Sequence, residues 1–260
     1  MSDWNIARVV DELAAREAER RDGGRLTDEW PGLDLTTAYK AQDELLTRRI
    51  HKGERVVGVK LGLTSEAKQR RMGIDAPLTA WLTDAMVLSE GEAIQVNSLI
   101  HPRIEPEIAF VMGESLHGSG VTRDQALAAV RSVHAGFEVI DSRFRDFSFA
   151  LPDVVADNAS ASVFVISAES LSPEALDLAA ERCDLAVDGE IVDSATGAAV
   201  QGHPAEALAL AANDLAARGH AIEAGSIVLT GGLTDAVLLG PGSEYSAAFT
   251  SLGTLTVKAT

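Results

Sequence analysis

The sequence has one cysteine, Cys183, and no apolar stretch long enough to cross a bilayer. A single cysteine cannot form a disulfide within the chain, which excludes a secreted, disulfide-stapled scaffold and leads us to expect a reducing cytosol. A membrane-spanning helix needs about 18 or more consecutive apolar residues, and no window approaches that length. The N-terminal stretch MSDWNIARVVDELAAREAERR also lacks the basic start and apolar centre of a signal peptide. We therefore expect a cytoplasmic protein that does not cross a membrane.

Positive charge is scarce as well. Lys and Arg number 22 against 39 Asp and Glu, which gives a formal net charge of −17. A surface of this sign repels the backbone of nucleic acids and anionic membranes, so neither is expected as a partner. The chain has 260 residues and 46% hydrophobic composition, which is enough for a sizeable core.

The first part of the chain, residues 1–54, has the pattern of two helices. Apolar residues recur at helical spacing over residues 4–20, and Gly23 and Gly24 follow as a stop. A second helix is expected over residues 36–50, with a glycine after its basic end. The sequence therefore predicts a short helical N-terminal region.

The composition changes at Arg55, where short runs rich in β-branched residues begin. Two helices, over about residues 122–133 and 204–217, interrupt these runs. Because strands and helices do not alternate strictly, a doubly wound fold is not favoured. We expect an α+β fold in which residues 55–260 form a β-rich domain, a mixed sheet that curls or packs on itself as a roll. The predicted strands are RVVGVKLGL, AMVLSEG, EIAFVMG, GFEVID, SVFVIS, CDLAVDGEIV, GSIVLTGG, AVLLGPG, SEYSAAFTS and GTLTVKAT.

Two glutamates interrupt one of these strands, in the run HPRIEPEIAF. Glu105 and Glu107 point to the same face, with α-carbons about 7 Å apart, so their side chains can share one cation. Oxygen ligands select Mg²⁺, Mn²⁺ or Ca²⁺. Glu138, among the β-like neighbours of HAGFEVID, is the candidate for a third ligand. The alternative is a solvated strand face, which Pro106 favours because proline is typical of edge strands and bulges.

Other polar residues allow two interpretations each. Lys60 lies in the apolar run VVGVKLGLT. A buried lysine is costly unless it is paired or functional, and can move protons, whereas an outward-facing one snorkels to solvent. Asp141 and Arg143 would face away from Glu138 in a regular strand, which favours a structural role. Cys183 has no evident partner histidine, so a catalytic thiol is not favoured.

Several segments together resemble a known family. They are GVKLGLTS, MGIDAPL, LIHPRIEPEIAFVMG, EVIDSRFRDF, VVADNAS, GHPAEALALAANDLAARG and IVLTGG, in this order. From about residue 34 to the end, the chain is similar to the 4-oxalocrotonate decarboxylase and 2-hydroxypenta-2,4-dienoate hydratase family of the fumarylacetoacetate hydrolase superfamily. The resemblance implies a β-rich catalytic domain behind a helical region. It also implies a divalent metal, Mg²⁺ or Mn²⁺, held by Glu105, Glu107 and Glu138.

Two branches of that family compete. The decarboxylase converts 2-oxo-3-hexenedioate into 2-hydroxypenta-2,4-dienoate during bacterial meta-cleavage of aromatic compounds, and the hydratase adds water to that product. In hydratases the residue after an Asp-x-Pro turn is often acidic, whereas here Asp75-Ala76-Pro77 is followed by Leu78. The segments IDSR and TGG also resemble the decarboxylase. We therefore favour the decarboxylase and keep the hydratase as the alternative.

The resemblance also implies roles and partners. The metal would act as a Lewis acid, Lys60 would add positive charge or move the proton, and Ser160 and Thr230 would donate hydrogen bonds to the dicarboxylate substrate. A homo-oligomer is expected, and a complex with the hydratase of the same pathway is an open alternative in which this chain is a scaffold. An acyl-cleaving activity would need a histidine–glutamate pair, for which His101 is the candidate.

Overall fold

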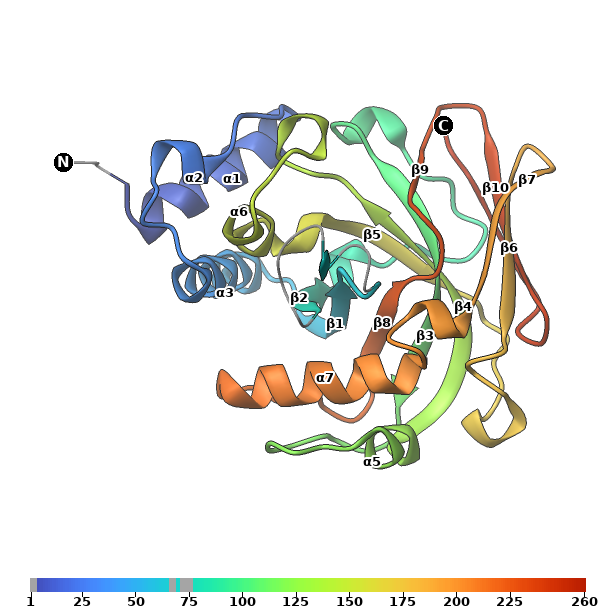
Figure 1. The fold of residues 1–260 in the computed structure, drawn as a ribbon. Helices are drawn as coiled ribbons and strands as arrows, with labels where there is room; N and C mark the ends of the chain where they lie inside the picture. Colours follow the sequence, from blue (N-terminus) through green and yellow to red (C-terminus); the bar gives the residue numbers. More distant parts are fainter. Residues whose placement is uncertain (1–3, 66–68, 71–76) are drawn as a thin grey trace.

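The computed structural model describes residues 4–65, 69–70 and 77–260 (Figure 1). Three helices come first: α1 (Ile6–Glu19), α2 (Leu26–Glu29) and α3 (Leu35–His51). The two long helices were predicted, and each begins at an acceptor side chain: Asn5 accepts a hydrogen bond from the Arg8 amide, and Asp34 from the Thr37 amide. The predicted stop of the first helix is wrong. The chain turns at Arg20, which takes the left-handed conformation at φ 53°, before the two glycines.

A seven-stranded mixed sheet forms the centre of the molecule. Its strand order is β2-β1-β8-β3-β4-β5, with β9 also paired to β3. Only the β1–β8 pair is parallel among the described strands, and the other neighbours are antiparallel. The strands are β1 (Val56–Gly62), β2 (Leu78–Thr83), β3 (Arg103–Met112), β4 (Val130–Ile140), β5 (Ala161–Ile166), β8 (Ile227–Gly232) and β9 (Val237–Leu238).

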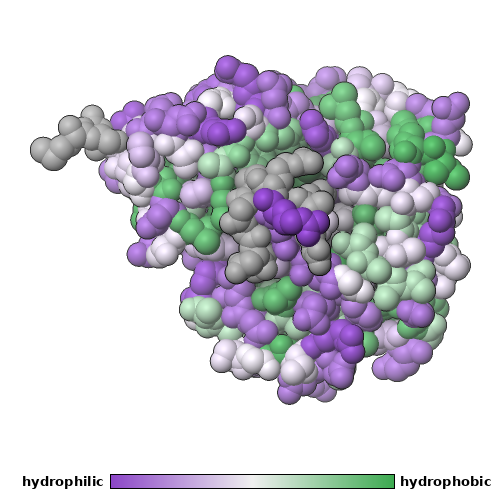
Figure 2. All heavy atoms as spheres, in the orientation of Figure 1, coloured by the Kyte–Doolittle hydropathy of each residue, from purple (hydrophilic) through white to green (hydrophobic). Residues whose placement is uncertain are grey.

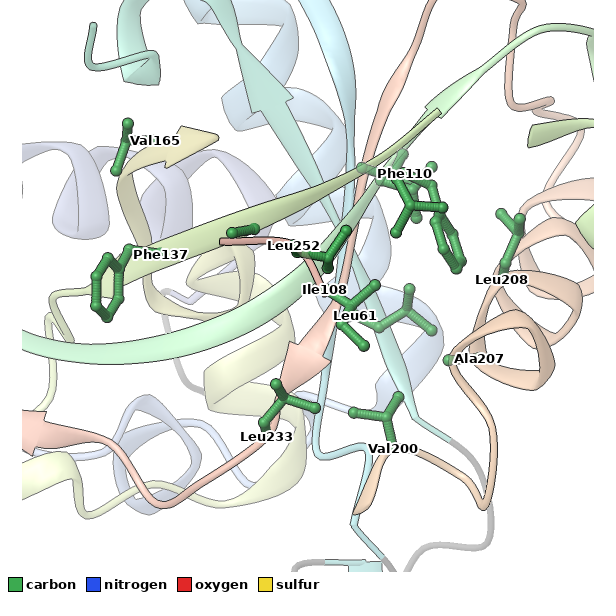
Figure 3. Close-up of a cluster of buried hydrophobic side chains, with 14 of the residues drawn as sticks. Leu61, Ile108, Phe110, Phe137, Val165, Val200, Ala207, Leu208, Leu233 and Leu252 are labelled. Atoms are coloured by element: carbon green, nitrogen blue, oxygen red, sulfur yellow. The ribbon is translucent and has the colours of Figure 1, made fainter. Parts of the chain in front are cut away.

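A second, antiparallel sheet of four strands packs against this one. Its order is β11-β10-β6-β7, from β6 (Arg182–Val187), β7 (Glu190–Thr196), β10 (Glu244–Phe249) and β11 (Thr254–Lys258). The main hydrophobic cluster lies between the sheets and under α7 (Pro204–Ala217); Figure 3 shows Leu61, Ile108 and Leu208 from β1, β3 and α7 in it. The α+β fold with a β-rich roll after helical residues is confirmed.

Two elements lie at other positions in the structure than the sequence predicts. The run AMVLSEG is not a strand: the strand is β2, just before it, whose residues are all buried and so show no alternation. Residues Asp84–Met86 form a 3-10 turn instead. The helix predicted to reach residue 133 is α5 (Arg123–Ala128), which has the expected capping box, and β4 begins at Val130 because its β-branched residues are buried in the sheet. The helices α2 and α6 (Leu151–Ala156) were not predicted.

The N-terminal helices have a second core, which they share with α6. Figure 1 shows α1, α2, α3 and α6 together on one side of the molecule, away from β6, β7 and β10. Buried residues of α1 and α3 pack with Leu78, Phe144 and Val155 from the later chain. Gln42 joins these parts, since its Nε2 donates to the carbonyl of Thr79 at 3.1 Å and of Val155 at 3.0 Å. Short 3-10 turns complete the chain at Val96–Ser98, Arg145–Phe147, Asn158–Ser160, Pro173–Ala175 and Gly197–Ala199.

In the part of the chain that the structure describes, every helix is too short or too polar to cross a membrane. Figure 2 shows a mainly hydrophilic face, with hydrophobic surface gathered at the corner where β7 and β10 lie.

Candidate active site

Three carboxylates meet where β3 and β4 pair. The register places Glu105 opposite Glu138, and Glu107 opposite Gly136 on β4 and Gly232 on β8. Within the described residues, one carboxylate oxygen from each glutamate lies within 4.8 Å of the others. Glu105 is 8% exposed, and Glu107 and Glu138 are fully buried, so the alternative of a solvated strand face is wrong.

Burial and mutual repulsion oppose ionisation of the two most deeply buried glutamates, Glu107 and Glu138. Burial raises the pKa of Glu107 well above its ordinary value, and the carboxylates of Glu138 and Glu105 raise it further. Burial also raises the pKa of Glu138, against the opposing effect of the Lys60 ammonium. The amide of Gly231 donates to Glu107 Oε2 at 2.7 Å, while Glu107 Oε1 is buried without a hydrogen-bond donor. Converging acceptors with an orphaned oxygen fit a divalent cation, which such oxygens bind.

Two glycines at the end of β8 let the sheet approach the carboxylates. Gly231 has a φ of +115°, and a Cβ there would collide with the Thr64 side chain. A Cβ on Gly232 would collide with Glu105 Oε2. Sequence reasoning missed this function of the pair, although the TGG segment was a visible signal.

Lys60 reaches the cluster from β1. Its Nζ lies 3.0 Å from Glu138 Oε1, bonds Oε2 at 3.3 Å, and donates to the carbonyl of Ala159 at 2.7 Å. Its side chain is 2% exposed, so the snorkelling alternative is wrong. Ala159 lies in a turn of three residues with left-handed φ values, 49°, 49° and 59° for Asn158 to Ser160. The Asn158 side chain fixes this turn to the backbone of Trp81 through two 2.9 Å hydrogen bonds.

A cavity of about 500 Å³ opens beside the cluster. Of the predicted metal, catalytic and substrate-binding residues, Lys60, Glu105 and Ser160 line it. Ser160 Oγ donates to Asp157 Oδ2 at 3.1 Å. Thr230 is buried away from the lining, and its hydroxyl donates to the Ile108 carbonyl at 2.7 Å. The remaining lining residues are Gly62, Leu63, Leu78, Arg103, Ile140, Phe147, Phe149, Val154, Ala159, Asp235 and Ala236.

Leu78, used above to choose between the branches, presents an apolar side chain to this cavity. Asp75 and Ala76 of the preceding turn lie outside the described residues. Sequence reasoning did not single out Arg103, Phe147 or Asp235, which stand far apart in the chain.

Several other candidates have structural partners. The Asp141 carboxylate accepts the amides of Ile100 and His101, each at 2.8 Å, and Arg143 forms a buried ion pair with Asp157. His101 bonds the carbonyl of Ser142 at 2.7 Å and lies 3.9 Å from Asp22, so its ring is engaged away from the glutamates. Burial raises the pKa of Cys183 to about 12, which makes a reactive thiolate unfavourable.

Known proteins match this chain over most of its length. The family model "Fumarylacetoacetate (FAA) hydrolase C-terminal" matches residues 55–259. A 4-oxalocrotonate decarboxylase of Pseudomonas sp. (strain CF600) is 39% identical over 95% of this chain and 94% of its own length. A 2-hydroxyhexa-2,4-dienoate hydratase of Comamonas testosteroni is 40% identical over 90% of each chain. The solved 4-oxalocrotonate decarboxylase from Pseudomonas putida G7, complexed with magnesium and adipate, superposes with a TM-score of 0.96 at 36% identity, over 98% of this chain and 97% of that one.

Proposed function

Because the chain belongs to the fumarylacetoacetate hydrolase family, we propose that it is a metal-dependent carboxy-lyase that converts 2-oxo-3-hexenedioate (4-oxalocrotonate) into 2-hydroxypenta-2,4-dienoate and CO₂. In this role it would act in the meta-cleavage degradation of aromatic compounds. The observation that carries the proposal is the buried cluster of Glu105, Glu107 and Glu138, joined to Lys60 at the wall of a cavity. The adipate in the Pseudomonas putida neighbour supports it, since adipate is a saturated dicarboxylate of the same carbon number as the substrate.

The three glutamates would hold a divalent cation, Mg²⁺ or Mn²⁺. Once bound, such an ion supplies a Lewis acid to the keto-acid end of the substrate. The supporting residues fix the carboxylates before the ion arrives: the Gly231 amide orients Glu107, and the Lys60 ammonium orients Glu138. Preorganised ligands of this kind lower the free-energy cost of binding.

Lys60 would handle the proton. An ammonium has three hydrogens, and Glu138 and the Ala159 carbonyl engage two of them, which leaves one for a substrate oxygen in the cavity. When the C5–C6 bond breaks, its electron pair forms the C4–C5 double bond and the former C3–C4 pair moves to C2–C3. Negative charge then reaches the C2 oxygen, which takes a proton from Lys60 Nζ to give the enol product. Ser160, at the same wall, would donate a hydrogen bond to the substrate. Thr230 would help to hold β8 against β3 beside the site, because its hydroxyl donates a hydrogen bond to the Ile108 carbonyl.

A hydratase is the second candidate. The 40% identity to the Comamonas testosteroni hydratase favours it. Leu78 argues for the decarboxylase, because an apolar side chain at this place in the cavity cannot activate water.

A paired assay separates the candidates. Purified protein is given Mg²⁺ or EDTA, with 2-oxo-3-hexenedioate in one tube and 2-hydroxypenta-2,4-dienoate in the other. We expect CO₂ release from the first, dependent on Mg²⁺, and little consumption of the second. Glu105→Gln and Glu107→Gln should lower turnover by about 100-fold or more, the scale of losing a preorganised electrostatic group. Water addition to the second compound without CO₂ from the first would establish the hydratase instead.

We further propose a cytoplasmic homo-oligomer, with association with the pathway hydratase as an additional arrangement. The single buried cysteine supports a reducing compartment. Exposed apolar side chains on the edge strand β7, Ile191 at 64% and Val192 at 50%, support an interface there. Light scattering of the protein alone, and then with the hydratase, tests both assemblies.

A further inference from the structure

The substrate of the proposed function carries a second carboxylate, and the metal cluster does not provide for it. The keto-acid end belongs at the glutamates. Among the described residues, the lysine beside the glutamates is Lys60, and it is already paired with Glu138. The other carboxylate, which leaves as CO₂, would therefore enter a cavity in which the remaining walls formed by described residues are largely apolar, unless another cation meets it. An unpaired carboxylate in such surroundings is unfavourable.

Arg103 is the cation placed to do this. It lies on β3 two residues before Glu105, so both side chains belong to the same strand face, with α-carbons about 7 Å apart. Both residues line the cavity. A short dicarboxylate lying along β3 would have one end near the glutamates and the other near this guanidinium.

The electrostatic state of Arg103 supports this assignment. Among the described residues its guanidinium has no carboxylate within ion-pair distance, whereas the buried Arg143 pairs with Asp157. Its guanidinium carbon lies 4.5 Å from the centroid of the Phe147 ring. The ring of His101 also lies 4.9 Å from the Phe147 ring, centroid to centroid, and Phe147 itself has a left-handed φ of +55°. A cation held over an aromatic face keeps its N–H groups available for a carboxylate.

We propose that Arg103 binds the leaving carboxylate of the substrate and thereby selects dicarboxylates over the monocarboxylate that a hydratase uses. The inference rests on the proposed function. Since CO₂ is neutral, the attraction to Arg103 is greatest before the C5–C6 bond breaks and falls as it breaks. Arg103 therefore lowers KM without raising kcat, because it stabilises the bound substrate at least as well as the transition state.

The test compares Arg103→Gln and Arg103→Lys with the wild type at saturating Mg²⁺. We expect Arg103→Gln to raise KM for 2-oxo-3-hexenedioate at least about tenfold, the loss of one charge-assisted hydrogen-bonded pair, while kcat stays equal or rises. The KM of Arg103→Lys should lie between those of the wild type and Arg103→Gln, because lysine keeps the positive charge but loses the two-pronged hydrogen bonding of a guanidinium. The matched control is Arg145→Gln, whose exposed side chain pairs with Asp22 at 3.3 Å outside the cavity lining.

Inhibitor binding provides the second readout. Arg103→Gln should weaken binding of adipate by the same factor and leave binding of pyruvate, a keto acid with one carboxylate, unchanged. A fall in kcat at constant KM, or equal loss of adipate and pyruvate binding, would overturn the proposal. Calorimetric titration of adipate and pyruvate needs no turnover, so it tests Arg103 even if the paired assay rejects the decarboxylase.

Discussion

A side chain on Gly232 would occupy the space of a Glu105 carboxylate oxygen. The obstacle is the end of a flexible side chain rather than backbone, so Gly232→Ala should fold with nearly unchanged stability while Glu105 turns away from the cluster. With one of three ligands displaced, we expect Mg²⁺ affinity to fall at least about tenfold, and turnover at limiting Mg²⁺ to fall with it. Isothermal titration calorimetry of the metal-free protein measures the affinity.

Gly240→Ala is the control for that change. Among the described residues, a Cβ on Gly240 would touch the Tyr245 hydroxyl alone, at 3.9 Å, which is ordinary contact. Its Mg²⁺ affinity should equal that of the wild type. If Gly232→Ala also binds Mg²⁺ as the wild type does, Glu105 is not a ligand in this protein.

The sequence alone predicts the positions of some residues of the site but not of others. The period of a strand predicts that Glu105 and Glu107 share a face, and this is enough to suspect a cation site. The same period puts Arg103 on that face, but no local pattern tells which face borders a cavity. At the TGG segment the sequence drew attention to the Thr230 hydroxyl, while the contact with Glu107 is made by the Gly231 amide. Backbone donors leave no signature in residue type.

At the scale of elements, α3 is joined to the rest of the chain by Gln42, whose amide nitrogen donates to the carbonyls of Thr79 in β2 and Val155 in α6. We propose that residues 1–54 form the helical region and residues 55–260 the catalytic domain, and that the two unfold together because they share a core. Gln42→Ala would leave two buried carbonyls without this donor. The expected loss is about 1–3 kcal/mol of stability, seen as one cooperative transition with a lower midpoint.

For Gln42→Ala, the midpoint of the unfolding transition should be the same when it is followed by circular dichroism and by a fluorescent dye that binds the core as unfolding exposes it. Gln95→Ala, on an exposed residue before a 3-10 turn, is the matched control and should melt as the wild type does. Two separate transitions, the first removing only helical signal, would show that the N-terminal region is an independent folding unit.

Elements were predictable where the residues at their ends mark where they begin and stop. Helix α7 was predicted with its observed bounds, because Pro204 begins it and Gly219 follows its end. Strand β2 was missed because it is buried on both faces, which removes the alternation that marks a strand. The helix before β4 was predicted too long because apolar residues continue without a break from α5 into the strand, and sheet pairing decided their conformation.

At the scale of the whole molecule, strand order and register could not be predicted from local patterns. Glu105 and Glu138 are neighbours only because β3 and β4 pair in one register, and a shift by one residue would move Glu138 to the other face. The sequence supplied this arrangement through its resemblance to a family rather than through spacing. Lys60 likewise reaches Glu138 only because β1 and the turn at Ala159 converge on β4.

The stability of the whole protein should depend jointly on pH and Mg²⁺. In the metal-free protein, burial raises the pKa values of Glu107 and Glu138 above their value of 4.5 in an unfolded chain. The folded state then holds protons that the unfolded chain releases, so these two groups destabilise the fold progressively as pH rises above the unfolded value. At the proposed site, Mg²⁺ would bind the ionised carboxylates and remove this penalty. The increase in melting temperature on adding Mg²⁺ should therefore grow between about pH 5 and about pH 8.

Differential scanning calorimetry with EDTA and with saturating Mg²⁺, at several pH values, measures that increase directly. The difference between the two curves cancels carboxylates elsewhere in the chain, which titrate alike in both. Glu107→Gln is the decisive variant, because it removes the most strongly perturbed charge while its amide oxygen can still accept from Gly231. Without Mg²⁺ it should melt higher than the wild type above about pH 6, and Mg²⁺ should add little at any pH. If Mg²⁺ increased the melting temperature of the wild type by the same amount across this pH range, the cation would bind away from the buried carboxylates.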